Sequence, residues 1–204
     1  MNSSLLKNIL LIVRVILPAI LCAFFVFLFE KLEYFKYNSI YFVISSFGII
    51  TVLLNLKKIK YNIVISLILS LNLCFFVFFV SMAIGGGIFY FLEKIMSFFS
   101  LNIEESSNIL FNSNNITSIA IIAPLLMFYL YSFILKINRS RFFYITIFSS
   151  IVILIVLGLT KVLFGNNVKM FIVWQFIVAL ALQLILYQEE LKAILLKKTC
   201  NNEA

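Results

Sequence analysis

The sequence contains no histidine, and none of its eight acidic residues is an aspartate. Histidine is the usual general base near neutral pH and the most common metal ligand. Without His and Asp, the triads of most hydrolases and the usual zinc sites cannot be assembled. An enzyme would have to rely on Glu, Lys, Arg, Ser, Tyr or Cys, and these form no recognisable catalytic constellation. We therefore expect a protein that is not an enzyme, with no catalytic residues, no metal site and no cofactor.

Cysteine is scarce and forms no motif. Cys22 and Cys74 fall within long apolar stretches, and Cys200 lies near the end of the sequence. There is no Cys-x-x-Cys pair, so neither a metal site nor a redox pair is indicated. The first two cysteines are expected to be small buried residues and the third an exposed thiol.

Charge is also scarce. Charged residues make up 12% of the chain and hydrophobic residues 64%, with a mean hydropathy of +1.15. Soluble domains contain about a quarter charged residues. A helix needs roughly 20 apolar residues to cross a bilayer. Backbone polar groups cannot stay unbonded in lipid, and the apolar stretches lack the alternation of a barrel strand, so the spans are expected to be helices. The sequence predicts an all-α polytopic membrane protein with one membrane domain, residues 1–204, and six transmembrane helices at 9–29, 40–56, 63–88, 118–137, 142–164 and 170–187.

The basic residues alternate between connections. Basic residues cluster in the second connection (Lys57, Lys58, Lys60), in the fourth (Lys136, Arg139, Arg141) and in the tail 188–204. The long connection 89–117, in contrast, holds three Glu and one Lys. Basic loops stay in the cytoplasm, so both termini are predicted to be cytoplasmic, and the net charge of +8 reflects orientation rather than nucleic-acid binding.

The first apolar run is predicted to be an uncleaved span, because it continues to Phe29 without a signal-peptidase site. The loop 89–117 is predicted to begin with a short interfacial helix, Phe89–Ser100, and to continue as an Asn- and Ser-rich loop. Heavy use of Ile, Phe, Asn, Lys and Tyr suggests the cell membrane of an AT-rich bacterium.

Gly85, Gly86 and Gly87 interrupt the third apolar stretch near its outer end. They are interpreted either as a hinge or unwound segment facing a cavity, or as a bend or close helix contact. Upstream, small residues recur at about every fourth position, which predicts a helix-packing stripe made of Ser66, Ser70, Cys74 and Ser81.

Three amides and one charge within the spans are candidate cavity-lining residues. Gln175 and Gln183 are eight residues apart and so lie close to one face of the last helix, and Asn72 lies in the third. Buried amides either bond between helices or line a polar pathway. Arg14 is an intramembrane charge, which indicates function by default, although it lies near enough to the cytoplasmic end to reach the headgroups.

Pro18 and Pro124 are the only prolines, and each is expected to kink its helix. Each also lies in the first span of a three-span half, and two such halves would be inverted relative to each other, as in many secondary transporters. Ala19-x-x-x-Ala23 resembles the coupling motif on the first helix of the substrate-binding subunits of energy-coupling-factor vitamin transporters, which also have six helices. The likeness is confined to this motif and a common topology, and it is not sufficient to assign the family.

These features favour a small transport or permeation protein, or a membrane subunit of a larger assembly. The alternative is an oligomerising membrane effector or regulatory accessory subunit, for example of a bacterial defence system, and a membrane-embedded enzyme comes third. The expected partners are the lipid bilayer and a second copy of the chain or another subunit. A transporter should contain a cavity, whereas an oligomerising effector should present a free small-residue face without one.

The predicted topology can be tested by cysteine labelling. Single cysteines at Lys58, Ser107 and Glu203, on a background without native cysteines, should differ in their reaction with an impermeant maleimide in intact cells. Only position 107 should be labelled, because it alone lies in an outer connection. Strong labelling at position 58 would refute the orientation.

Overall fold

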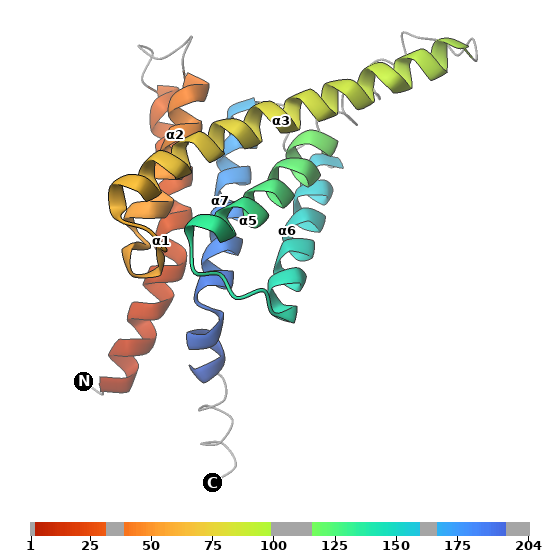
Figure 1. Cartoon of the computed structure of the whole chain (residues 1–204). Helices are drawn as coiled ribbons and strands as arrows, with labels where there is room; N and C mark the ends of the chain where they lie inside the picture. Colours follow the sequence, from red (N-terminus) through yellow and green to blue (C-terminus); the bar gives the residue numbers. More distant parts are fainter. Residues whose placement is uncertain (1–2, 32–38, 99–115, 160–166, 195–204) are drawn as a thin grey trace.

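The computed structural model describes residues 3–31, 39–98, 116–159 and 167–194 of the chain. Within these ranges the regular structure is helical, apart from one isolated antiparallel bridge between Ile59 and Leu135. The elements, shown in Figure 1, are α1 (Ser3–Lys31), α2 (Ser39–Leu53), the 3₁₀ turn η2 (Leu56–Lys58), α3 (Ile63–Phe98), the π-helical segment η3 (Ile116–Ile122), α5 (Ala123–Ile134), α6 (Arg141–Leu159) and α7 (Asn167–Leu186).

The predicted all-α class is confirmed, with four or five candidate membrane spans among the described residues. Four stretches are long and apolar enough, namely Leu6–Phe29, Ile63–Ile95, Thr117–Ile134 and Arg141–Leu159. The fifth is Phe171–Leu186 if it is counted together with Gln188–Ile194, which meets it at a bend of 69°. The predicted span 40–56 corresponds to α2, whose apolar part, Tyr41–Leu53, is shorter than the others.

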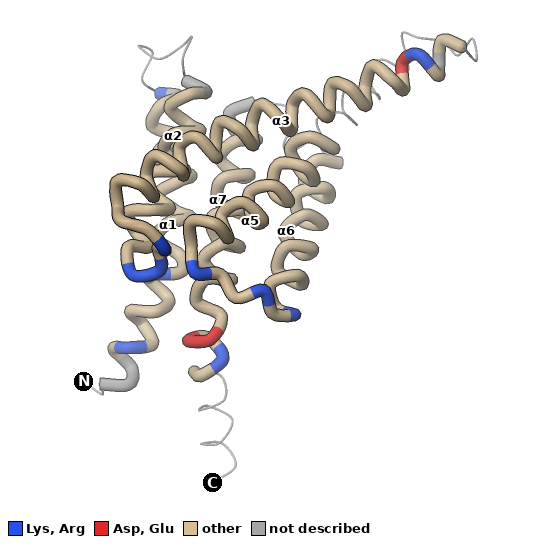
Figure 2. The backbone as a smooth tube through the Cα atoms, viewed as in Figure 1, with Lys and Arg blue, Asp and Glu red and all other residues tan. Residues whose placement is uncertain are grey.

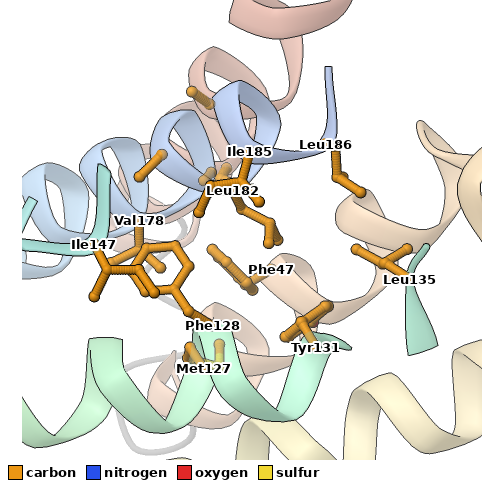
Figure 3. Close-up of a cluster of buried hydrophobic side chains, with 14 of the residues drawn as sticks. Phe47, Met127, Phe128, Tyr131, Leu135, Ile147, Val178, Leu182, Ile185 and Leu186 are labelled. Atoms are coloured by element: carbon orange, nitrogen blue, oxygen red, sulfur yellow. The ribbon is translucent and has the colours of Figure 1, made fainter. Parts of the chain in front are cut away.

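The bundle is built around α1 and α7, which run antiparallel and make extensive contact (Figure 1). α3 crosses them obliquely and packs on α2 and α5, while α6 packs on α7 and η3. Figure 3 shows large side chains from α2, α5 and α7 meeting at the centre, among them Phe47, Phe128 and Leu182, all nearly inaccessible. In lipid such side chains hold the helices together through close packing, because there is little hydrophobic driving force between helices there.

α3 is longer than predicted. It runs without a break for 36 residues, passes through Gly85–Gly87, and ends at Phe98 instead of giving way to a separate interfacial helix after Ile88. Its last turns extend beyond the other described helices in Figure 1, and Phe91 and Phe98 are exposed there. The remainder of the predicted outer loop, residues 99–115, lies outside the described residues.

Basic residues gather at one end of the bundle (Figure 2). The connection after α2, the connection after α5 and the first described turns of α1 all carry Lys or Arg at this end, which is also where Gln188–Ile194 lies. Away from this end, Figure 2 shows blue on the last turns of α1 and near the far end of α3.

Three segments are joined at this end, and we call them the basic-end junction: residues 54–62, residues 135–141 and Tyr187–Ile194. The Lys60 N–H donates to the Ile134 carbonyl at 2.9 Å, and the Lys136 N–H donates to the Lys58 carbonyl at 2.8 Å. The Gln188 side chain donates to the Asn138 carbonyl at 2.8 Å and accepts a hydrogen bond from Ser140. Residues 54–62 and 135–141 are thus paired through their backbones. Gln188 ties the segment that follows α7 to residues 135–141.

The Lys58 ammonium joins residues 54–62 to the segment that follows α7. It lies 2.6 Å from a carboxylate oxygen of Glu190 and 5.1 Å from the ring centroid of Tyr187. Burial raises the pKa of the Glu190 carboxyl, but the hydrogen bond from Lys58 and the charges of Lys58 and Arg14 outweigh it, so the pKa lies below its ordinary value. The ionised pair therefore stabilises the bend after Leu186.

We predict that Glu190→Gln lowers stability at neutral pH by less than about 1 kcal/mol, because both partners are partly exposed. Since the folded-state pKa of Glu190 is depressed, its contribution is complete above the unfolded-state pKa and is lost as the pH falls through the folded-state pKa. Thermal unfolding in detergent should therefore separate wild type from variant at pH 7 but not at strongly acidic pH. The matched control is Glu189→Gln, whose partner Lys192 is 3.5 Å away, and it should have no effect. Equal effects of both variants would contradict the assignment.

Candidate functional site

A partly open pocket of about 40 Å³ lies inside the bundle between α2, α3, α5, η3 and α7. By this measure a water molecule needs roughly 10–15 Å³, so the pocket has room for about three waters or a similar number of non-hydrogen atoms. Its walls are mostly apolar and aromatic. The polar lining residues are Gln175, Ser81 and Cys74.

Gln175 is buried to 1% exposure, and its amide has a fixed orientation. The amide nitrogen donates to the Val43 carbonyl of α2 at 2.6 Å, and that carbonyl also accepts from the Ser46 hydroxyl at 2.8 Å. A flipped amide would place two carbonyl oxygens in contact, so the nitrogen is correctly assigned as the donor. The side-chain oxygen is left without a partner in a pocket-lining residue.

The neighbouring residue Trp174 forms a rigid wall of the pocket. Its indole N–H donates to the Ile119 carbonyl of η3 at 2.7 Å, and its ring lies 6.1 Å from that of Phe47. An indole held by both a hydrogen bond and a ring contact has little freedom to move. The consecutive residues Trp174 and Gln175 thus bind η3 and α2, and both line the pocket.

The side of the pocket nearer the basic end is closed by a hydrogen-bonded cluster centred on Tyr131. Its hydroxyl lies 2.7 Å from the Ser70 hydroxyl and 3.3 Å from the Cys74 sulfur, and Ser70 donates to the Gly48 carbonyl at 3.0 Å. The Tyr131 ring packs edge-on against Phe47 with centroids 6.0 Å apart. Tyr131, Ser70 and Gly48 therefore connect α5, α3 and α2 directly beneath the pocket.

The predicted cavity-lining residues occupy different places. Gln175 lines the pocket, whereas Gln183 is fully buried elsewhere on α7 with neither amide atom bonded. Asn72 lies on the exposed face of α3, where it donates to the Ile68 carbonyl at 2.8 Å. Arg14 is exposed on α1, near enough to Glu190 to favour its ionised form. The structure brings only Gln175 of these to the pocket.

The residues of the predicted packing stripe, Ser66, Ser70, Cys74 and Ser81, are all buried on one face of α3, and Cys74 and Ser81 also line the pocket. Gly85 is buried as well, but a β-carbon at Gly86 or Gly87 would meet no atom within 4 Å. In this chain, then, neither of these two glycines permits a close helix contact.

The small residues of α1 and both prolines pack within the chain. Ala19 of the Ala-x-x-x-Ala motif is fully buried in the core. Pro18 is buried within α1, and the helix continues on both sides of it. Pro124 lies in the first turn of α5, directly after the π-helical segment η3, so it marks the change from one helix type to the other.

Three residues of the site were not predicted from the sequence. Tyr131 and Trp174 each combine an aromatic ring with one hydrogen-bonding group, and such residues need a partner when they are buried. Trp174 is the only tryptophan of the chain, and it lies next to Gln175, which is a signal that could have been used. Gly48 carries no signal beyond being an isolated glycine in an apolar stretch.

A second hollow, of about 160 Å³, lies between α1 and α2 and is more open than the pocket. Its polar lining residues are Ser45 and Ser46, and the Ser46 hydroxyl donates to Val43. Among the described residues, no three His, Cys, Asp or Glu side chains lie together as metal ligands. Because the pocket at Gln175 is more enclosed than this second hollow, it is the better candidate site.

Comparison with known proteins gives no match: no family model, no curated protein and no solved structure is similar to this chain. Any function must therefore be argued from the site itself.

We predict that Gly48→Ala destabilises the protein by about 1–3 kcal/mol, because the new methyl group would overpack the contact between α2 and α3. Its carbon would lie 3.2 Å from the sulfur of Cys74, 3.2 Å from the hydroxyl oxygen of Ser70 and 3.3 Å from the Ser70 carbonyl oxygen. Thermal unfolding of the purified protein in detergent measures the effect.

The matched control is Gly86→Ala, which meets open space and should leave stability unchanged or raise it by up to about 1 kcal/mol through helix propensity. If both variants were equally stable, the close approach of α2 and α3 at Gly48 would be wrong. If Gly86→Ala were the damaging variant, Gly86 would be in contact with something outside this chain.

Proposed function

We propose that this chain is a non-enzymatic transport or permeation protein of the cell membrane, acting alone or as the membrane subunit of a larger assembly. The supporting observation is the partly open pocket between α2, α3, α5, η3 and α7, which has room for about three waters and includes Gln175, Ser81 and Cys74 in its mostly apolar lining. A mainly apolar pocket with a few polar groups, placed between the helices of a bundle, is the usual form of a small-molecule site.

The pocket also favours this proposal over an oligomerising effector. The effector hypothesis requires a free face of small residues for contact between copies. Ser66, Ser70, Cys74 and Ser81 are instead covered within the chain, where they face α2, α5 and the pocket. The proposal retains six spans with cytoplasmic termini in a bacterial membrane, and the gathering of basic residues at one end of the bundle supports this orientation.

Tyr131 and its partners close the pocket toward the basic end, which we take to be cytoplasmic. A transported molecule would leave on that side only after the contacts of Tyr131 with Ser70 and Phe47 break. In this proposal the pocket is closed on the cytoplasmic side, and alternating access consists of opening the contacts of Tyr131 with Ser70 and Phe47.

We predict that filling the pocket at Cys74 blocks flux. Liposomes containing the protein should pass a small neutral solute, 1,2-propanediol, faster than empty liposomes, as measured by stopped-flow light scattering. Cys74→Met adds a longer apolar side chain at a residue that lines the pocket, so it should fill much of the space and reduce flux.

The control for this experiment is Cys22→Met. Cys22 is fully buried in the core and does not line the pocket, so flux should persist. Circular dichroism reports whether each variant is folded. Absence of flux with the wild-type protein, or undiminished flux through folded Cys74→Met protein, would refute the proposal.

A further inference from the structure

Two cations from different connections bind the same residue, Ser132, at the basic end of the bundle (Figure 2). The Lys60 ammonium donates to the Ser132 carbonyl at 2.6 Å, and the Arg139 guanidinium donates to the Ser132 hydroxyl at 2.7 Å. Ser132 lies two residues before the end of the candidate span Thr117–Ile134. Both charges are therefore held where this span meets the lipid headgroups.

The Arg139 side chain is fixed by two further contacts of its surroundings. Its guanidinium lies over the Tyr129 ring, 5.1 Å from the centroid, and that ring packs edge-on against the fully buried Phe143. The Ser132 hydroxyl, which accepts from Arg139, donates to the Tyr129 carbonyl at 2.6 Å. A guanidinium held by both a ring face and a hydrogen bond loses little further freedom when it binds a ligand.

Neither cation has a carboxylate partner in the part of the chain that the structure describes. The ion pairs there are Lys58 with Glu190 and Lys192 with Glu189. The hydrogen bonds to Ser132 use one N–H of an ammonium that has three and one of a guanidinium that has five. Because like charges held near one residue repel each other, an anion with several acceptor oxygens would be bound favourably between them.

Capping of α5 explains only part of this arrangement. The Lys136 N–H, which would continue the helix to the Ser132 carbonyl, donates to the Lys58 carbonyl instead. The Lys60 ammonium supplies the missing donor. The hydrogen bond of Arg139 to Ser132 is to the side chain, so it completes no helical carbonyl. A second cation at this position is not required by the helix end.

The surface beside the two cations is apolar. Tyr129 and Phe133 are four residues apart on α5, so they are neighbours on one side of the helix, and both are exposed. A free phosphate ion has no group that such a surface would bind, whereas a phospholipid places hydrocarbon chains directly below its phosphate. Basic residues at the ends of membrane helices are the usual binding groups for anionic headgroups.

We infer that Lys60 and Arg139 form a binding site for the phosphate of an anionic glycerophospholipid, whose acyl chains lie along Tyr129 and Phe133 of α5. The site goes beyond the proposed function and uses no residue of the pocket. Its failure would leave transport untouched, and the absence of transport would leave this site untouched.

Lipid binding to the purified protein in detergent tests the inference. The protein is titrated with dioleoyl phosphatidylglycerol and, separately, with dioleoyl phosphatidylcholine, and bound lipid is counted by native mass spectrometry. The two lipids share their chains and a phosphate, but only phosphatidylglycerol carries a net negative charge. We expect it to bind more tightly by about tenfold or more, the effect of two cations near one anionic headgroup.

Two double variants separate this site from the charge of the basic end as a whole. Lys60→Gln with Arg139→Gln should lose the preference for phosphatidylglycerol. The matched control is Lys57→Gln with Arg141→Gln, which removes one exposed Lys and one exposed Arg from the same two connections and should keep the preference. Equal losses in the two double variants would overturn the site, because the lipid would then be selected by net charge alone.

The comparison of the two lipids uses the unmodified protein, so it stays decisive if a variant does not fold: equal affinities would overturn the inference. Inorganic phosphate distinguishes a free anion from a lipid. In molar excess it should leave phosphatidylglycerol bound, because it has no acyl chains to contact α5. Displacement of the lipid would assign the two cations to a free phosphate and refute the lipid site.

Discussion

The arrangement of the bundle depends on how closely α2 approaches α3 at Gly48. The absence of a side chain there lets the Ser70 hydroxyl reach the Gly48 carbonyl, and Ser70 in turn pairs with Tyr131 of α5. One short contact therefore fixes three helices relative to each other. Because Tyr131 also packs on Phe47, the same contact defines the inner boundary of the pocket. In lipid, where polar groups have few other partners, such a contact specifies geometry as well as stability.

The helical membrane class could be predicted from the sequence, because it depends on length and hydropathy alone. The number of spans could not be predicted, because α2 is short and the helix Gln188–Ile194 meets the end of α7 at a bend of 69°. Hydropathy has no information on either feature. The bend depends on Lys58, Glu190 and the bridging Gln188, which are far apart in the sequence and meet only through the fold.

Only part of the candidate site could be predicted, because its contacts also join residues that are far apart in the sequence. Gln175 and Gln183 are equivalent in the sequence, as amides on similar faces of one helix. Only Gln175 lies opposite a carbonyl, that of Val43, and beside an unfilled space. Asn72 is exposed, because it lies two residues from both Ser70 and Cys74 and therefore on the opposite side of α3. Which polar residue of a span points inward is decided by its neighbours, and a single sequence does not contain them.

The length of α3 has a consequence for the membrane itself. The apolar stretch Ile63–Ile95 has 33 residues, which at 1.5 Å per residue is about 50 Å, against a hydrocarbon core of about 30 Å. To remain in hydrocarbon the helix must tilt steeply, which fits its oblique course across α1 and α7. A thicker bilayer would bring it closer to the membrane normal. Since α3 carries Cys74 and Ser81, we expect the width of the pocket to change with the thickness of the surrounding lipid.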